Sequence, residues 1–202
     1  RLFGQEGDDS LSGQEGIDQL SGGAGDDAVF GDDGNDVLLG DEGNDTILGG
    51  RGDDGLRGGL GDDILEGGEG SDFYVFHLGD GHDVISDGAG SQEVNELVFG
   101  PGIARADLTF VHDSARQSLM IQINGGTNSV ELLGVDLNNV AGTTPVKLLS
   151  FADGSQIALA DQMPLAHGFI EGDEGDEIIR TGFGDDIADA QGGNDVVFAG
   201  GG

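Results

Sequence analysis

An aspartate recurs every nine residues near the start of the chain, and these carboxylates are the side chains best spaced to do chemistry. They hold the sixth position of a nine-residue repeat that begins at Gly4 and runs through eight copies: Asp9, Asp18, Asp27, Asp36, Asp45, Asp54, Asp63 and Asp72. Their even distribution indicates metal ligation rather than a paired acid–base site, which needs two carboxylates in unlike environments.

The remaining invariant positions predict the elements that hold these carboxylates. Glycine fills positions one and four of every copy, so six residues can form a tight turn. Position eight is always large and apolar: Leu11, Leu20, Val29, Leu38, Ile47, Leu56, Leu65 and Tyr74. Positions seven to nine therefore suit a three-residue strand whose middle side chain points inward. Two copies, or eighteen residues, complete one coil of a solenoid with two facing sheets.

Stacked coils place the aspartates in two columns, and these columns require a cation. The odd column holds Asp9, Asp27, Asp45 and Asp63, and the even column holds Asp18, Asp36, Asp54 and Asp72. Neighbouring carboxylates lie about 4.8 Å apart and repel by roughly 3.5 kcal/mol at an effective dielectric of about 20. The chain has no cysteine, and the eight copies contain no histidine, so only oxygen ligands are available. Such sites select Ca²⁺, and three neighbouring pairs in each column predict about six ions.

The repeat G-G-x-G-x-D-x-U-x resembles that of the RTX family of bacterial exoproteins, which includes haemolysins, adenylate cyclase toxins, serralysin-type proteases and large adhesins. The resemblance implies a parallel β-roll that binds calcium. It further implies a secreted, extracellular protein of a Gram-negative bacterium, exported unfolded by type I secretion machinery and folding outside the cell. In the leading interpretation the parent is a toxin with the block–linker–block organisation of adenylate cyclase toxin-like proteins.

Composition agrees with calcium-dependent folding and excludes some partners. The chain carries 40 acidic and 7 basic residues, a formal charge of −33, which excludes nucleic acid and disfavours anionic membrane surfaces. One buried aliphatic side chain per copy stabilises too little to offset the entropy of ordering nine residues. Calcium must therefore supply folding free energy, and the metal-free repeats are predicted to be largely unfolded.

Degenerate repeats continue beyond the eighth copy. The frame slips after Val75 and a ninth copy, Leu78–Ser86, keeps Asp83, which we predict to be a further ligand of the odd column. The repeat returns in register at Gly172, and the sixth positions of this second block are predicted ligands: Glu177, Asp186 and Asp195. Both chain ends fall within the repeat register, so we expect a piece of a longer solenoid protein.

Between the two blocks, alternating hydrophobic residues predict strands at 96–99, 108–111, 119–123, 129–133, 146–151 and 156–159. We therefore predict an all-β chain of three units. Residues 1–86 form a calcium-binding β-roll, residues 87–166 an antiparallel β linker or capping domain with its own small core, and residues 167–202 the start of a second, truncated β-roll. The cluster Tyr74–Phe76 is expected to pack on Leu97–Phe99, so that the linker caps the first roll.

Several other interpretations are weaker. Arg51-Gly52-Asp53 spells an integrin-binding tripeptide but falls on a repeat turn, where Gly52 is needed for the turn itself. His77 and His82 lie near Asp80 and Asp83, yet their spacing matches no established zinc pattern. No apolar run reaches membrane-spanning length.

The sequence also carries no sign of catalysis, and one alternative function stays open. No nucleophile elbow, zinc-protease motif or phosphate-binding loop occurs, so we expect no enzyme activity in this stretch. The alternative is a ligand-binding module of a secreted adhesin or polysaccharide-modifying enzyme. With 5% aromatic residues and 7 basic ones the roll offers little for such a surface, so any binding patch would lie in residues 87–166.

Overall fold

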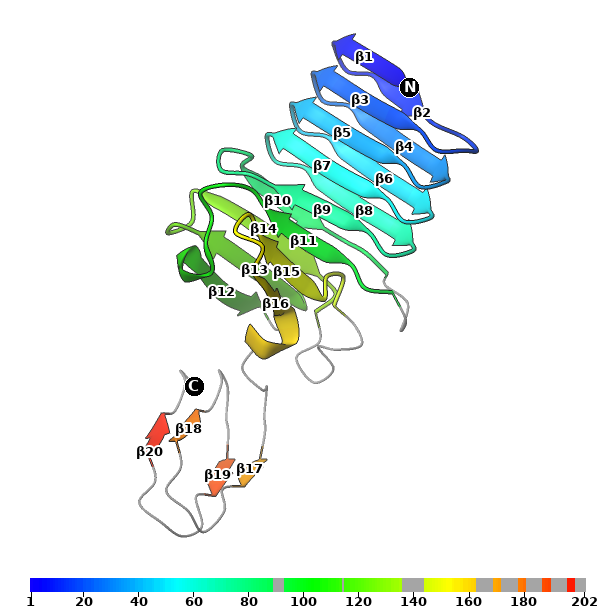
Figure 1. Ribbon diagram of the computed structural model, residues 1–202. Coiled ribbons are helices and arrows are strands. Elements are labelled where there is room, and N and C mark those ends of the chain that lie inside the picture. The colour runs from blue at the N-terminus through cyan, green and yellow to red at the C-terminus, as the bar shows by residue number, and fades with distance from the viewer. Residues whose placement is uncertain are drawn as a thin grey trace.

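The computed structural model is an all-β solenoid in which nine-residue repeats stack as flat coils (Figure 1). It describes residues 1–88, 93–113, 115–135 and 144–162, together with the backbone of four short strands between residues 169 and 198. Within these residues the only helical segments are two short 3₁₀ turns, Arg105–Asp107 and Leu159–Gln162. None of the described helical segments is long and apolar enough to cross a bilayer.

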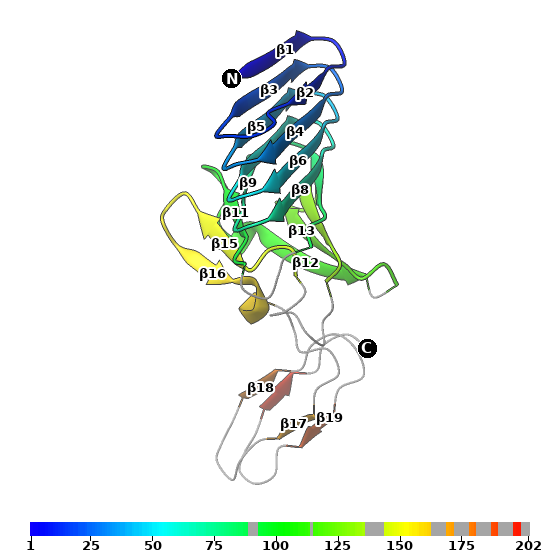
Figure 2. The same cartoon turned by 90° about the vertical axis from the view of Figure 1, so that its right-hand side faces the viewer.

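The eight repeats alternate between two sheets, as predicted. One sheet contains β1 (Leu2–Glu6), β3 (Gln19–Ala24), β5 (Val37–Glu42), β7 (Gly55–Leu60) and β9 (Phe73–Phe76). The facing sheet contains β2 (Ser10–Ser12), β4 (Ala28–Asp33), β6 (Thr46–Arg51), β8 (Ile64–Glu69) and β10 (His82–Ile85). All these strands pair in parallel, and Figure 2 shows the two sheets facing each other.

Strands pair with a register of eighteen residues, so the side chains at position eight stack on one another between the two sheets. Leu20 pairs with Leu38, and Val29 with Ile47, so like positions stack directly. Most strands are six residues long rather than three, because the backbone at positions two and three pairs as well. The glycine at position one lies inside each of these strands but has no partner in the pairing register.

The side chains at position eight form the core of the roll. Leu11 is 6% exposed, and the other seven are at most 2% exposed. They belong to one cluster of buried side chains that continues without interruption to Leu159. The described part of residues 87–166 therefore shares the core of the roll rather than having the separate small core predicted for it, because both sheets extend into that segment.

The strands after β9 lengthen both sheets of the roll. Strand β11 (Glu96–Phe99) pairs in parallel with β9, and β15 (Leu148–Phe151) pairs in parallel with β11. On the facing sheet, β14 (Asn128–Leu133) pairs in parallel with β10. Leu97, Val98 and Phe99 lie opposite Tyr74, Val75 and Phe76, so the expected packing of these two clusters is confirmed.

Antiparallel hairpins complete each sheet. Strands β12 (Leu108–Asp113), β13 (Ser118–Ile123) and β14 form a meander at the edge of one sheet. Strand β16 (Gln156–Ala158) returns antiparallel to β15 at the edge of the other. Among the described residues, the strands between residues 87 and 162 are thus antiparallel only at the outer edges, and the boundary predicted at residue 87 coincides with the end of neither sheet.

The second block shows the same coil spacing in its backbone. Its four strands have three residues each: β17 (Phe169–Glu171), β18 (Ile178–Arg180), β19 (Ile187–Asp189) and β20 (Val196–Phe198). Strand β17 pairs in parallel with β19, and β18 with β20. This parallel pairing of alternate repeats is the pairing found in the first block.

Candidate metal sites in two aspartate columns

One carboxylate oxygen of each repeat aspartate links two neighbouring coils. The Oδ1 atom of Asp27 accepts a hydrogen bond from the backbone N–H of Asp9, at 2.7 Å. The same bond recurs along both columns at 2.7–2.8 Å, and its acceptors are Asp36, Asp45, Asp54, Asp63 and Asp72. The structure therefore gathers the predicted ligands of the first block into the two columns expected from the spacing.

Each column ends in a residue outside the regular frame. Asp83 accepts from the N–H of Asp63 at 3.3 Å and continues the odd column, as its place in the ninth copy suggested. Asn95 accepts from the N–H of Asp72 at 2.9 Å and ends the even column. The sequence did not reveal Asn95, because it lies 23 residues after Asp72 and is out of phase with the repeat.

The second carboxylate oxygen is buried without a protein partner. Among the described residues this is true of Oδ2 in seven repeat aspartates: Asp9, Asp27, Asp36, Asp45, Asp54, Asp63 and Asp72. Asp54, Asp63 and Asp72 are fully buried. A buried anionic oxygen without a partner is strongly unfavourable. Its recurrence in seven of the eight copies indicates that these oxygens are suited to a cation partner.

The glycine at position one leaves the space beside this oxygen. A Cβ atom added to Gly40 would overlap Oδ2 of Asp45 and would lie 2.5 Å from the carbonyl oxygen of Gly58, one coil further on. Gly31 and Gly49 have the corresponding neighbours. Beside Asp36, Asp45 and Asp54 the partnerless oxygen therefore has a backbone carbonyl oxygen nearby, and only a residue without a side chain leaves both of them room.

These oxygens suit calcium, provided that the backbone contributes. Among the described residues, no three His, Cys, Asp or Glu side chains come close enough to hold a metal ion between them. The carboxylates are spread along the columns, so an ion between coils needs carbonyl ligands as well. Ca²⁺ takes several oxygen ligands, including backbone carbonyls, in flexible geometry. The residues therefore fit a calcium ion.

Burial perturbs these carboxyl groups where no cation is bound. It raises the pKa of Asp45 and Asp63 to about 6, and that of Asp54 to about 7. Burial also raises the pKa of Asp83 to about 8, and the charge of Asp63 adds to the effect. These shifts report the cost of keeping the columns charged without a counter-ion.

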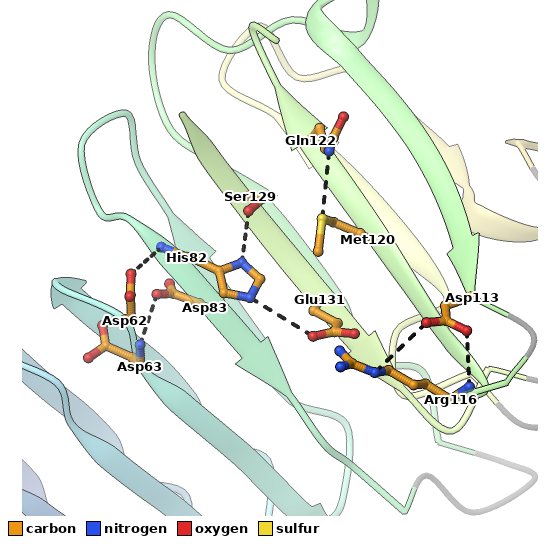
Figure 3. Close-up of polar contacts among 10 residues, drawn as sticks. All are labelled: Asp62, Asp63, His82, Asp83, Asp113, Arg116, Met120, Gln122, Ser129 and Glu131. Carbon is orange, nitrogen blue, oxygen red and sulfur yellow. Dashed lines mark hydrogen bonds and ion pairs between the residues drawn. The ribbon is translucent and has the colours of Figure 1, made fainter. Parts of the chain in front are cut away.

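The end of the odd column involves His82 in hydrogen bonds rather than in a metal site (Figure 3). The backbone N–H of His82 donates to Oδ1 of Asp62 at 3.0 Å, and its ring Nδ1 lies 2.8 Å from Oγ of Ser129 on β14. Its Nε2 lies 3.9 Å from Oε2 of Glu131. His82 thus joins the ninth copy to the following strand.

Position five carries a second hydrogen-bond ladder, which the spacing of the position-six aspartates did not indicate. Here the side chain accepts from the N–H of the next coil: Asp26 from Asn44 at 2.8 Å, and Asp53 from Ser71 at 2.9 Å. Seven of the eight copies have an Asp, Asn or Ser at this position, and Ile17 is the exception. That run of acceptors is the signal that could have revealed the ladder.

The tripeptide Arg51-Gly52-Asp53 belongs to this framework. Arg51 donates from Nε and Nη2 to the carboxylate of Asp33, at 2.7 and 2.5 Å. Gly52 has a φ of 128°, and Asp53 is an acceptor of the position-five ladder. All three residues thus have structural roles. The predicted ligands Glu177, Asp186 and Asp195 lie outside the described residues.

A parallel β-roll with columns of buried carboxylates defines a repeat-built, metal-binding solenoid. The family model of the RTX calcium-binding nonapeptide repeat matches residues 3–38, 39–74 and 171–202, which together exceed half of the chain. The chain therefore belongs to the RTX calcium-binding repeat family.

Other comparisons add little to this assignment. The chain is 26% identical to the AlgE6R3 subunit of the Azotobacter vinelandii mannuronan C5-epimerase, whose structure was solved in solution. The match covers 65% of this chain and 73% of that one, with a TM-score of 0.36. At this TM-score the likeness carries no structural weight. A search of curated proteins found no match.

Proposed function

We propose that this chain is a calcium-driven folding module of a secreted bacterial protein. Calcium ions sit between successive aspartates of each column, with the carbonyl oxygen of a position-one glycine as a further ligand. The odd column offers four neighbouring pairs when Asp83 is included, and the even column offers three. In the second block, Glu177, Asp186 and Asp195 continue the pattern.

The observation that supports this proposal most directly is the set of partnerless Oδ2 atoms in the repeat aspartates. A network of protein hydrogen bonds would not leave the same buried atom unpaired in copy after copy. Without calcium these charges oppose folding, and with calcium they hold the coils together. Binding and folding are then one event.

Coupled folding suits export. The family resemblance points to type I secretion, in which an extended chain leaves a low-calcium cytosol and folds where calcium is abundant. We infer an extracellular location in a Gram-negative host, and a role in the secretion and folding of a larger exoprotein, a toxin in the leading interpretation. In this proposal residues 1–86, 87–166 and 167–202 serve as first roll, linker or cap, and second roll, and the activity of the parent lies elsewhere.

The test is a calcium titration of matched variants, followed by circular dichroism, with bound ions counted by metal analysis. Asp45→Asn keeps the Oδ1 acceptor but replaces the partnerless Oδ2 with an amide nitrogen. We expect it to need more calcium to fold and to bind fewer ions. Asp26→Asn makes the same change at an exposed position, and its calcium midpoint and ion count should match those of the unsubstituted chain. The proposal is wrong if the parent folds fully in chelator, or if the two variants behave alike.

A further inference from the structure

The even column ends in a buried network that involves no repeat aspartate side chain. The hydroxyl of Tyr74 donates to Oδ2 of Asp87 at 2.5 Å and accepts from the N–H of Gly67 at 2.7 Å. The side-chain amide of Asn95 donates to the same Oδ2 at 2.6 Å. Asp87 Oδ1 accepts from the N–H of Gly68 at 3.3 Å.

This network differs from the columns in that its side chains are satisfied by protein alone. Both oxygens of Asp87 have donors, whereas Oδ2 of the neighbouring Asp72 has none. The space beside the position-one glycine is also filled differently. At Gly49 its nearest atoms include the carbonyl oxygen of Gly67, whereas at Gly67 they include the hydroxyl of Tyr74. The three hydrogen bonds give the Asp87 carboxylate protein donors that the column aspartates lack, although burial still raises the pKa of Asp87.

The network also ties the last repeat to the strands that follow. Asn95 donates to the carbonyl oxygen of Pro145 at 2.9 Å, and its own carbonyl oxygen accepts from the N–H of Lys147, also at 2.9 Å. Its Oδ1 holds the N–H of Asp72. Three segments distant in sequence therefore meet at one buried amide.

From these contacts we infer that Tyr74, Asp87 and Asn95 form a calcium-independent lock. The lock closes the end of the even column without an ion and joins the eighth repeat to β11 and β15. It rests on the proposed function in that the repeats themselves need calcium. The coil that carries the lock closes first, and the repeats toward Gly4 order on it as calcium binds.

The chain provides its own probe, because Tyr74 is its only tyrosine and it has no tryptophan. Tyrosine fluorescence with acrylamide as quencher therefore reports the lock, while far-ultraviolet circular dichroism reports the roll. In a calcium titration of the full chain, we expect Tyr74 to be protected already in chelator, before the circular dichroism of the roll develops. Protection that develops only together with the roll, at the same calcium concentration, would overturn the inference.

A pair of variants makes the test specific. Asn95→Asp places a second carboxylate against Asp87, so Tyr74 should lose its protection in chelator. Asn44→Asp makes the same change at an exposed position of the odd repeats and should keep it. Equal protection in the two variants would refute the lock. If the circular dichroism of the roll does not change with calcium, the proposed function is wrong. Protection of Tyr74 in chelator then still tests the lock independently.

Discussion

At the residue scale, the glycine at position one is as necessary to the site as the aspartate. It leaves the space that Oδ2 of the aspartate and a carbonyl oxygen of the next coil share. We predict that Gly40→Ala costs about 1–3 kcal/mol of stability from overlap alone, and that it weakens calcium-induced folding further by displacing Asp45.

The matched control for this substitution is Gly55→Ala. An added Cβ at Gly55 meets only the carbonyl oxygen of Asp36, at 3.8 Å, and this glycine does not have a positive φ. That variant should be neutral or stabilised by about 0.4–1 kcal/mol, because alanine restricts the unfolded chain. Calcium titrations followed by circular dichroism compare the two, and equal midpoints would show that the space beside Asp45 is unimportant.

The site residues that the sequence predicted were those in phase with the repeat. Asp9 to Asp72 follow from a fixed spacing, and Asp83 was still recognisable in a degenerate copy. Asp87 and Asn95 were missed because their positions depend on how the chain crosses between the sheets after β10. No periodicity encodes that crossing. Tyr74 was predicted correctly to lie in the core. The hydrogen bond from its hydroxyl to Asp87 could not be predicted, because the position of Asp87 was not known.

At the element scale, each coil is joined to its neighbours by two ladders of opposite direction. Side chains at position six accept from the preceding coil, and those at position five accept from the following coil. Ile17 interrupts the second ladder and is 83% exposed. Ile17→Asn should supply an acceptor for the N–H of Asn35 and raise stability by about 0.5–1.5 kcal/mol.

Urea unfolding at saturating calcium measures this effect. Asn44→Ala removes an acceptor from the same ladder and should lower stability by a similar amount. If both variants unfold at the urea midpoint of the parent, the position-five ladder contributes nothing to stability.

The strands of the eight copies were predicted by their centres but not in length, and the six strands at 96–159 were predicted in order. The apolar residue at position eight marks a strand centre, whereas positions two and three pair only because the coils stack in register. Similarly, alternation and turn residues identified β11, β14 and β15 and the antiparallel partners of β14 and β15, but not the parallel partners of these three strands. The parallel pairing of β11 with β9 depends on the whole roll, so local sequence cannot indicate it.

At the scale of the whole molecule, the carboxylate columns predict that the metal-free chain is more stable at low pH than at neutral pH. Burial raises the pKa of Asp45 and Asp63 to about 6 and that of Asp54 to about 7, above their value in the unfolded chain. Their contribution to stability is present at low pH and lost as pH rises through 6 to 7. In chelator, we expect circular dichroism to show more β-structure at pH 5 than at pH 8.

With calcium present the direction should reverse. Protons compete with the cation for the same oxygens, so acidification should raise the calcium concentration needed for folding. A metal-free chain that stays equally unfolded at both pH values would show that carboxylate repulsion does not control folding.

The length of the folded unit gives a further prediction. A chain that ends at Phe76 loses the strand paired with β9 and exposes Tyr74 and Phe76, which are buried in the whole molecule. Phe76 also loses its edge-to-face contact with Phe99, whose ring centroid lies 6.4 Å away. This chain should stay disordered in calcium that folds residues 1–166. If the two titrate with the same midpoint and steepness, the segment after Phe76 is only a spacer.

Because repeats alternate between two sheets, the number of repeats sets both the length of the roll and the relative orientation of its two ends. Each added pair of copies lengthens it by one strand spacing, about 4.8 Å, and turns its two ends only by the twist between neighbouring strands. A single added copy instead turns whatever is joined to one end by half a coil relative to the other. It also separates partners eighteen residues apart, such as Asp33 and Arg51. Changes in repeat number are therefore expected to preserve geometry only in steps of two copies.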